Sequence, residues 1–108
     1  MNQYLILVLT EPTEDKEDEF NDYYENTHLD EVIESAGYAS AQRFRLVNQV
    51  GEQCPLPYLA VYEAEGESAD EVLARLNDSR GQRQQSDALN KKTGRIWVYE
   101  TIGPRHSD

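Results

Sequence analysis

The chain has 108 residues, the length of one domain, and we expect a single domain over residues 1–108. Its formal net charge of −11 argues against nucleic acid and anionic membrane surfaces as partners, because both require basic patches. The only cysteine, Cys54, allows no internal disulfide, and no segment has the roughly 20 apolar residues of a membrane helix. We therefore expect a cytoplasmic protein. One Cys and two His form no zinc pattern, so no metal site is predicted.

The chain begins with a predicted strand and a predicted helix. Residues 4–10 form a continuous apolar run that does not alternate, so both faces of this strand are expected to be buried. A helix is predicted from Lys16 towards Glu34, with Thr13 or Asp15 as its N-cap. The apolar pattern is loose around residues 26–28, which indicates a kink or a break. Gly37 is expected to end this helix near the C′ position.

Two strands are predicted next, separated by a loop over residues 48–57. The first covers residues 38–47, where Arg43 shares a face with small alanine side chains. The second covers residues 58–64, where Tyr58 and Tyr62 share a face. The alternation of side chains along each strand thus separates these residues into two sets, one for each face of a sheet.

A capping box predicts the second helix, because Ser68 and Glu71 are spaced to satisfy each other's backbone donors. Residues 77–92 are polar and weakly patterned, so we expect an irregular loop with one short helical turn near Ala88 and Leu89. A final strand is predicted over residues 95–102.

The predicted order is strand, helix, strand, strand, helix, strand, which is the βαββαβ arrangement of an α+β ferredoxin-like fold. Such a fold has an antiparallel four-stranded sheet with both helices on one face. The other face would be bare in a monomer, although the first and last strands are apolar. The simplest solution is a homodimer whose sheets pack face to face, so a second copy of the chain is an expected partner.

Several segments resemble the EthD-like branch of the dimeric α+β barrel superfamily. They are Phe20 to Tyr24, Asn26 to Leu29, Gly37 to Phe44, Tyr58 to Glu63 and Ile96 to Glu100. The resemblance covers nearly the whole chain. It implies a ferredoxin-like protomer, a dimeric α+β barrel, and a pocket between the helices and the sheet. The wider superfamily includes polyketide cyclases, cofactor-independent monooxygenases, lactone isomerases, decarboxylases and haem-degrading enzymes.

His28 is the main candidate for chemistry, because it lies four residues after Tyr24 and eight after Phe20 on one predicted helix face. It would act as a general base or acid on a phenol or on carbon beside a carbonyl. Asn26, Tyr24 or a backbone carbonyl would set its tautomer. The alternatives are a structural histidine, and haem ligation, for which no second axial ligand is evident.

Other residues are candidates for binding a substrate. Tyr24 would donate to a carbonyl oxygen, or else only pack in the core. Phe20, Asn26, Arg43 and Tyr62 are the predicted substrate-binding residues. Among them Arg43 would bind an anionic or phenolate group, with a surface salt bridge as its alternative role.

Two function hypotheses follow. The first is a small cofactor-independent enzyme that acts on a cyclic, aromatic or polyketide-like molecule by proton transfer through His28. Cyclisation, isomerisation, decarboxylation and oxygenation all remain open, and cofactor independence rests on the absence of a nucleotide loop or metal cluster. The second is a non-catalytic homodimer, of a binding or stress-associated kind, that holds a hydrophobic small molecule. The surroundings of His28 discriminate between the two.

Overall fold

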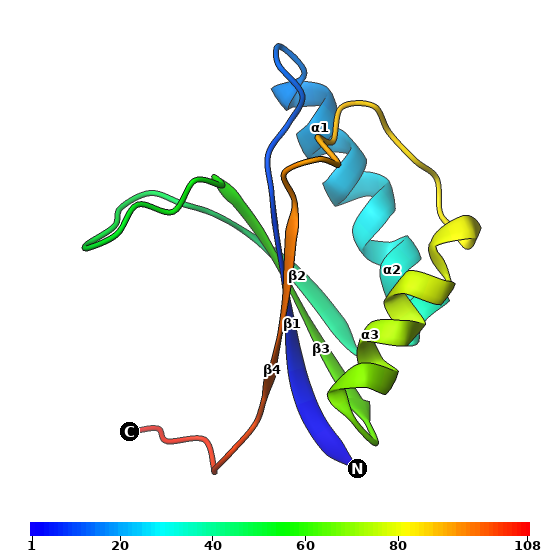
Figure 1. The fold of residues 1–108 in the computed structure, drawn as a ribbon, viewed down its shortest axis with the longest axis vertical. Helices are drawn as coiled ribbons and strands as arrows, with labels where there is room; N and C mark the ends of the chain where they lie inside the picture. Colours follow the sequence, from blue (N-terminus) through cyan, green and yellow to red (C-terminus); the bar gives the residue numbers. More distant parts are fainter.

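The computed structural model describes residues 1–108 and contains one four-stranded antiparallel sheet with helices on one of its faces (Figure 1). The strands are β1 (Asn2–Thr10), β2 (Ser40–Arg45), β3 (Tyr58–Gly66) and β4 (Arg95–Glu100), and their order in the sheet is β2-β3-β1-β4. All three neighbouring pairs are antiparallel. This is the predicted α+β ferredoxin-like fold.

The first helical segment is continuous from residue 17 to residue 36 but changes its winding in the middle. It consists of α1 (Glu17–Tyr23), a π-helical turn η1 (Tyr24–His28) and α2 (Leu29–Ala36). The irregularity expected around residues 26–28 is therefore a wider turn and not a break. Gly37 ends the segment in the left-handed region with φ of 70°, and its N–H donates to the carbonyl of Ile33 at 3.0 Å.

The start of this helix differs from the prediction. Lys16 is the N-cap, and neither Thr13 nor Asp15 caps the helix with its side chain. The Lys16 N–H instead donates to the Thr13 carbonyl at 3.0 Å, and Asp15 has a positive φ of 65°. A tight turn thus leads into the helix, and three acids at residues 17–19 lie in its first turn, where the helix dipole favours negative charge.

The second helix, α3 (Ala69–Asp78), begins as predicted, because the Glu71 N–H donates to the Ser68 hydroxyl at 3.1 Å. The return bond of the capping box is shifted by one residue, since the Glu71 carboxylate accepts from the Glu67 N–H at 2.8 Å. The helical turn expected near residues 88–89 is wrong. The short turn is a 3₁₀ helix, η2 (Arg80–Gln82), directly after α3.

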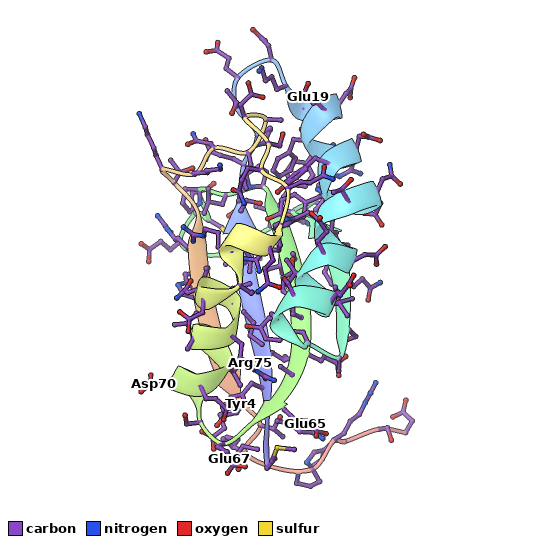
Figure 2. All side chains as sticks on the ribbon, turned by 90° about the vertical axis from the view of Figure 1, so that its right-hand side faces the viewer. Tyr4, Glu19, Glu65, Glu67, Asp70 and Arg75 are labelled. Carbon is purple, nitrogen blue, oxygen red and sulfur yellow. The ribbon has the colours of Figure 1, made fainter.

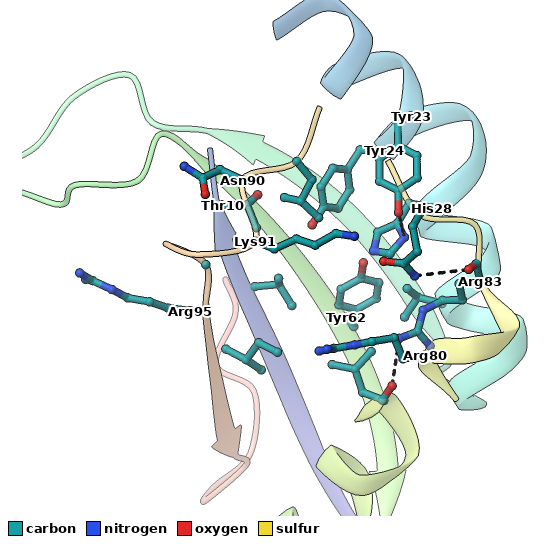
Figure 3. A pocket seen from close by; sticks show the side chains of 17 residues that line it. Thr10, Tyr23, Tyr24, His28, Tyr62, Arg80, Arg83, Asn90, Lys91 and Arg95 are labelled. Carbon is teal, nitrogen blue, oxygen red and sulfur yellow. Dashed lines mark hydrogen bonds between the residues drawn. The ribbon is translucent and has the colours of Figure 1, made fainter. Parts of the chain in front are cut away.

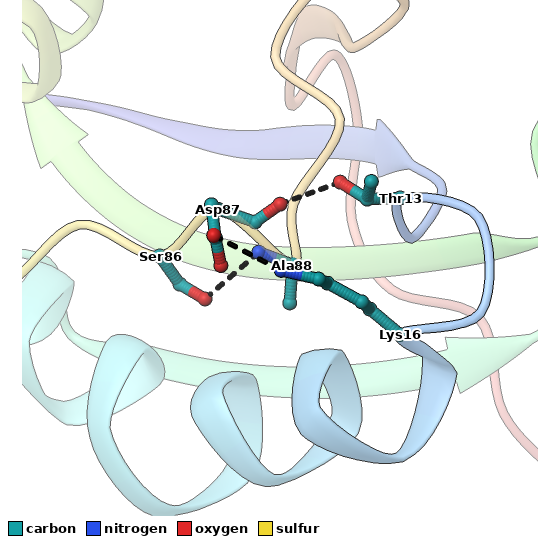
Figure 4. Close-up of polar contacts among 5 residues, drawn as sticks. All are labelled: Thr13, Lys16, Ser86, Asp87 and Ala88. Carbon is teal, nitrogen blue, oxygen red and sulfur yellow. Dashed lines mark hydrogen bonds and ion pairs between the residues drawn. The ribbon is translucent and has the colours of Figure 1, made fainter.

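The loop that follows η2 is fixed to the turn between β1 and α1 (Figure 4). The Thr13 N–H donates to the Ala88 carbonyl at 2.6 Å, and the Thr13 hydroxyl donates to the Asp87 carbonyl at 2.6 Å. The Lys16 ammonium lies 3.0 Å from the Asp87 carboxylate. Leu89 forms an isolated bridge with Pro12. A segment that is irregular in sequence therefore has a defined position over the sheet.

The core lies between the helices and the sheet and is rich in aromatic side chains. Figure 2 shows the helices in front of the sheet and the charged side chains on the outside, with Glu19 at one end and Glu65, Glu67 and Asp70 at the other. None of the helices has the length and apolarity required to cross a membrane. The excess of acid is thus displayed outward, away from the inner layer.

The sheet has one covered face and one open face. On β1, Tyr4 and Ile6 point into the core, whereas Leu5 on the other face is 43% exposed. Across the ladder, Trp97 and Tyr99 of β4 share this open face and are 43% and 54% exposed. Within one chain, the face of β1 that packs against the helices is buried, as predicted. The opposite face is buried only at the C-terminal end of the strand, near Leu9.

Candidate functional site

A cavity of about 320 Å³ lies between the helix layer and the sheet (Figure 3). Residues from all three helical segments, from the loop after α3, and from β1, β3 and β4 line it. The aromatic lining comes from Tyr23, Tyr24, His28 and Tyr62, and apolar side chains such as Val8 and Val32 complete the walls. The cavity is thus formed by residues that are far apart in the sequence and that meet because the helices cover the sheet.

His28 reaches this cavity from the end of the π turn. Its ring stacks on Tyr23 with centroids 5.0 Å apart and meets the Tyr24 ring edge-on at 4.8 Å. Tyr23 and His28 are five residues apart, a spacing that does not align on an α-helix but does align on the wider π turn. The π turn therefore explains why Tyr23 and His28 face each other.

The hydrogen bonds around Tyr23 fix the tautomer of His28. The Tyr23 hydroxyl donates to the Gln84 carbonyl at 2.8 Å and lies 2.9 Å from Nδ1 of His28. A phenol has one proton, and a carbonyl can only accept, so the proton of the second bond must come from Nδ1. His28 thus carries its hydrogen on Nδ1, which leaves Nε2 as an unprotonated acceptor with no hydrogen-bond partner in the protein.

Burial and electrostatics keep this imidazole neutral. Burial, with the positive charge of Arg83 as a second cause, lowers the pKa of His28 to about 4. Burial, followed by the neighbouring Tyr24, raises the pKa of Tyr23 to about 12. At neutral pH the pair is therefore a protonated phenol that orients a neutral imidazole, and Nε2 is free to accept a proton.

Tyr62 rises from β3 below His28, and its hydroxyl points toward the cavity (Figure 3). The residue is 1% exposed, and burial raises the pKa of its phenol. The hydroxyl has no hydrogen-bond partner in the protein. A buried phenol of this kind is expected to find a partner, and a ligand oxygen in the cavity would supply one.

The cavity brings together three of the six predicted site residues, namely His28, Tyr24 and Tyr62. Phe20 is completely buried and packs against Tyr24 and Tyr58 in the core. Asn26 is exposed and donates to the Asp22 carboxylate at 2.7 Å, so it does not orient His28. Asn26, Tyr24 and a backbone carbonyl were the partners considered for the imidazole, and the hydrogen bond is instead made with Tyr23.

Arg43 lies outside the cavity, on the other side of Tyr24. Its guanidinium stacks over the rings of Phe20, Tyr24 and Tyr58 at 5.0–5.5 Å. It also donates to the Asn21 side chain at 2.7 Å and lies 3.6 Å from the Glu25 carboxylate. The geometry matches the salt-bridge alternative for Arg43, at the edge of a shallow depression separate from the cavity.

Sequence reasoning missed most of the lining, and the missed residues that bear most on chemistry are Tyr23, Arg80, Arg83 and Lys91. Tyr23 was not singled out, because the sequence does not show that the irregularity of the helix is a π turn. The three cations lie in the segment 77–92, which has no periodic pattern. Only the concentration of cations in a chain of net charge −11 could have drawn attention to them. No group of three or more His, Cys, Asp or Glu side chains is arranged to hold a metal ion.

Comparison with solved structures places the fold in a known class. The chain resembles the crystal structure of an ethyl tert-butyl ether D (EthD) family protein from Bacillus halodurans, with a TM-score of 0.53 and 18% sequence identity. The match covers 94% of this chain and all of the other. The protein thus has an EthD-like ferredoxin-like α+β fold. Comparison with family models and with curated protein sequences finds no match.

Proposed function

We propose that this protein is a small enzyme that acts on a cyclic, aromatic or polyketide-like molecule by proton transfer through His28. The observation that supports it best is the free Nε2 of a neutral imidazole in a cavity lined by tyrosines. A structural histidine usually has both ring nitrogens satisfied, whereas a general base needs one nitrogen open to the substrate. The cavity has the volume of a typical small-molecule site.

In the proposed step, Nε2 of His28 takes a proton from a carbon beside a carbonyl, or from a phenol. The electron pair of the broken C–H bond moves into the carbonyl, which becomes an enolate oxygen. The Tyr62 hydroxyl is placed to donate to that oxygen, and Tyr23 holds the imidazolium that forms through Nδ1. Cyclisation, isomerisation and oxygenation can each begin from such an anion.

Proton transfer can be tested without knowledge of the natural substrate. 2-Tetralone, an aromatic cyclic ketone, exchanges its activated C1 protons for deuterium in D₂O, and NMR follows the exchange. We expect the protein to accelerate this exchange about 10²-fold or more, the lower range for a positioned general base. His28→Gln should abolish the acceleration, because an amide cannot take the proton.

His106→Gln is the matched control, because His106 is the only other histidine and lies in the exposed tail. It should leave the exchange rate unchanged. Equal rates for the native protein and His28→Gln would refute the enzyme proposal. The alternative would then stand, namely a non-catalytic protein that holds a hydrophobic small molecule.

We also propose that the protein forms a homodimer through the open face of the sheet. Leu5, Trp97 and Tyr99 give this face a large exposed apolar area, which is unusual for a monomer. Sedimentation velocity at micromolar concentration should give a dimer. Trp97→Glu should dissociate it, whereas Asn77→Glu, which adds the same charge on α3, should not. A monomeric native protein would contradict this proposal.

A further inference from the structure

The charge of the cavity is opposite to that of the whole protein. Its lining includes four of the ten Lys and Arg residues of the chain and none of the 21 Asp and Glu residues. The Arg95 side chain extends away from the cavity, whereas Lys91 reaches toward His28 and Arg80 lies at the opposite wall (Figure 3). With the buried Arg83, three cations thus surround the space above Tyr62.

Arg83 is the most informative of these cations, because it is only 9% exposed and has no acidic partner. Its NH1 and NH2 groups donate to three neutral acceptors, Ser35, Ser79 and the Leu76 carbonyl, at 2.7–3.0 Å. Its Nε–H is buried without any acceptor. Buried charges are nearly always paired in proteins, since an unpaired charge in a low-dielectric interior is costly.

Arg80 adds a second positive charge near the unpaired charge of Arg83. Its positive charge lies close enough to lower the pKa of Arg83, in addition to the effect of burial. Two guanidinium groups and one ammonium group therefore line a cavity whose walls contain no carboxylate, and the nearby Glu31 carboxylate accepts from the Gln84 N–H and not from these cations. Side chains of one sign in a cleft focus the electrostatic field and raise the local concentration of the opposite ion.

We infer that the substrate of this cavity carries a carboxylate, which Arg83, Arg80 and Lys91 hold while the carbon to be deprotonated faces His28. This inference rests on the proposed function and names the class of substrate, an aromatic or cyclic carboxylic acid. The carboxylate replaces the missing counter-ion of Arg83. It also fits a planar group beside guanidinium donors, which carboxylates match in geometry.

A bound carboxylate would also improve the base. Arg83 is one of the two causes that lower the pKa of His28, so an anion beside Arg83 offsets part of that effect. The imidazole then becomes a stronger base only when the substrate is present. A neutral analogue of the same shape would not produce this change, which gives the inference a second and independent readout.

The test compares two ligands of nearly equal shape, 2-naphthoate and 2-naphthamide, by isothermal titration calorimetry. We expect naphthoate to bind about tenfold more tightly or better, the effect of one charge-assisted hydrogen bond. Its affinity should fall as NaCl is added, while that of naphthamide should not. In NMR titrations, naphthoate but not naphthamide should raise the pKa of His28.

Arg80→Gln and Lys91→Gln should each reduce the preference for naphthoate, and both positions are exposed, so the fold should be kept. Lys92→Gln is the matched control, because Lys92 is adjacent in sequence but does not line the cavity. Equal affinity for the two ligands, or an equal loss in Lys92→Gln, would overturn the inference. Because this assay measures binding and not proton transfer, it can fail while 2-tetralone exchange succeeds, and the reverse.

Discussion

Two arginines near the aromatic core have different surroundings, because Arg83 lines the cavity and Arg43 lies outside it. Arg43 stacks on three aromatic rings, donates to Asn21 and faces the carboxylate of Glu25. Arg83 contacts no ring within cation–π distance, has only neutral acceptors and faces a cavity. The charge of Arg43 is therefore compensated by a carboxylate of the same chain, whereas the charge of Arg83 is not.

Sequence position alone therefore does not reveal which arginine has its charge compensated within the chain. Arg43 lies on a regular strand beside small side chains, which made it the expected anion-binding residue. The structure gives it a complete set of partners instead. Arg83, in an unpatterned loop, is the residue whose charge remains uncompensated, and a buried charge without a partner requires an explanation.

The largest expected effect concerns the pH dependence of stability, because burial and, second, the charge of Arg83 lower the pKa of His28, whereas Arg43 does not contribute. The pKa of His28 is about 4 in the folded protein and 6.5 in the unfolded chain. As the pH falls, the unfolded chain therefore binds the proton first, and stability is lost between pH 6.5 and pH 4. The full stabilisation, present above pH 6.5, is about 3 kcal/mol at most.

Urea denaturation of the native protein and of His28→Gln at pH 7 and at pH 4 measures this contribution. The difference in free energy of unfolding between the two proteins should shrink at the lower pH, because the variant lacks the titrating group. Subtracting the free energy of unfolding of the variant also removes the effect of the carboxylates, because both proteins contain them. His106→Gln should behave like the native protein. A pH-independent difference would show that His28 is not shielded from protonation.

A smaller expected effect is the difference in stability between variants of the two arginines. Arg43→Met should lower the free energy of unfolding by about 2 kcal/mol, through the loss of its ring contacts and its bond to Asn21. Arg83→Met should cost less than about 1 kcal/mol, because losing an unpaired buried charge offsets the lost hydrogen bonds. Ser79 keeps its bond to the Arg75 carbonyl, so few groups are left unsatisfied.

Chemical denaturation at pH 7 measures the free energy of unfolding of both variants and of the native protein. If Arg83→Met proved the more destabilising of the two, Arg83 would be a structural residue and the comparison would fail. Arg83→Met should also raise the pKa of His28, whereas Arg43→Met should leave it unchanged, because burial and then Arg83 lower this pKa and Arg43 does not contribute.

The fold could be predicted from the sequence because its elements carry strong local signals. The apolar run of β1, the Ser68 cap and Gly37 each indicate one structure by a simple physical rule, and all three are confirmed. The first N-cap was wrong because the chain enters α1 through a turn with Asp15 at positive φ, a conformation that the sequence does not signal. The order of elements then restricted the topology to a ferredoxin-like sheet.

The site could be predicted only in part. Helix spacing brought Tyr24 and His28 together, and strand alternation put Tyr58 and Tyr62 on one face, which in the structure is the buried one. The alternation alone did not tell which face of the sheet that would be. The sequence indicated an irregularity at residues 26–28 but not that it is a π turn, and so the pairing of Tyr23 with His28 was missed. The position of the loop after η2 depends on long-range contacts with Thr13 and Lys16, which no local pattern encodes.

The fixed loop after α3 has a consequence for how such a protein can change. Arg80, Arg83 and Lys91 all come from one stretch of twelve residues, whereas His28 and Tyr62 come from the first helical segment and the sheet. Under the proposed function, the residues that would bind the carboxylate and the residue that would move the proton therefore lie in separate parts of the chain. Replacing residues 80–91 alone, with the contacts to Thr13 kept, would then change the range of substrates while His28 stays the same. Residues 80–91 would thus be the segment to exchange in order to engineer substrate choice.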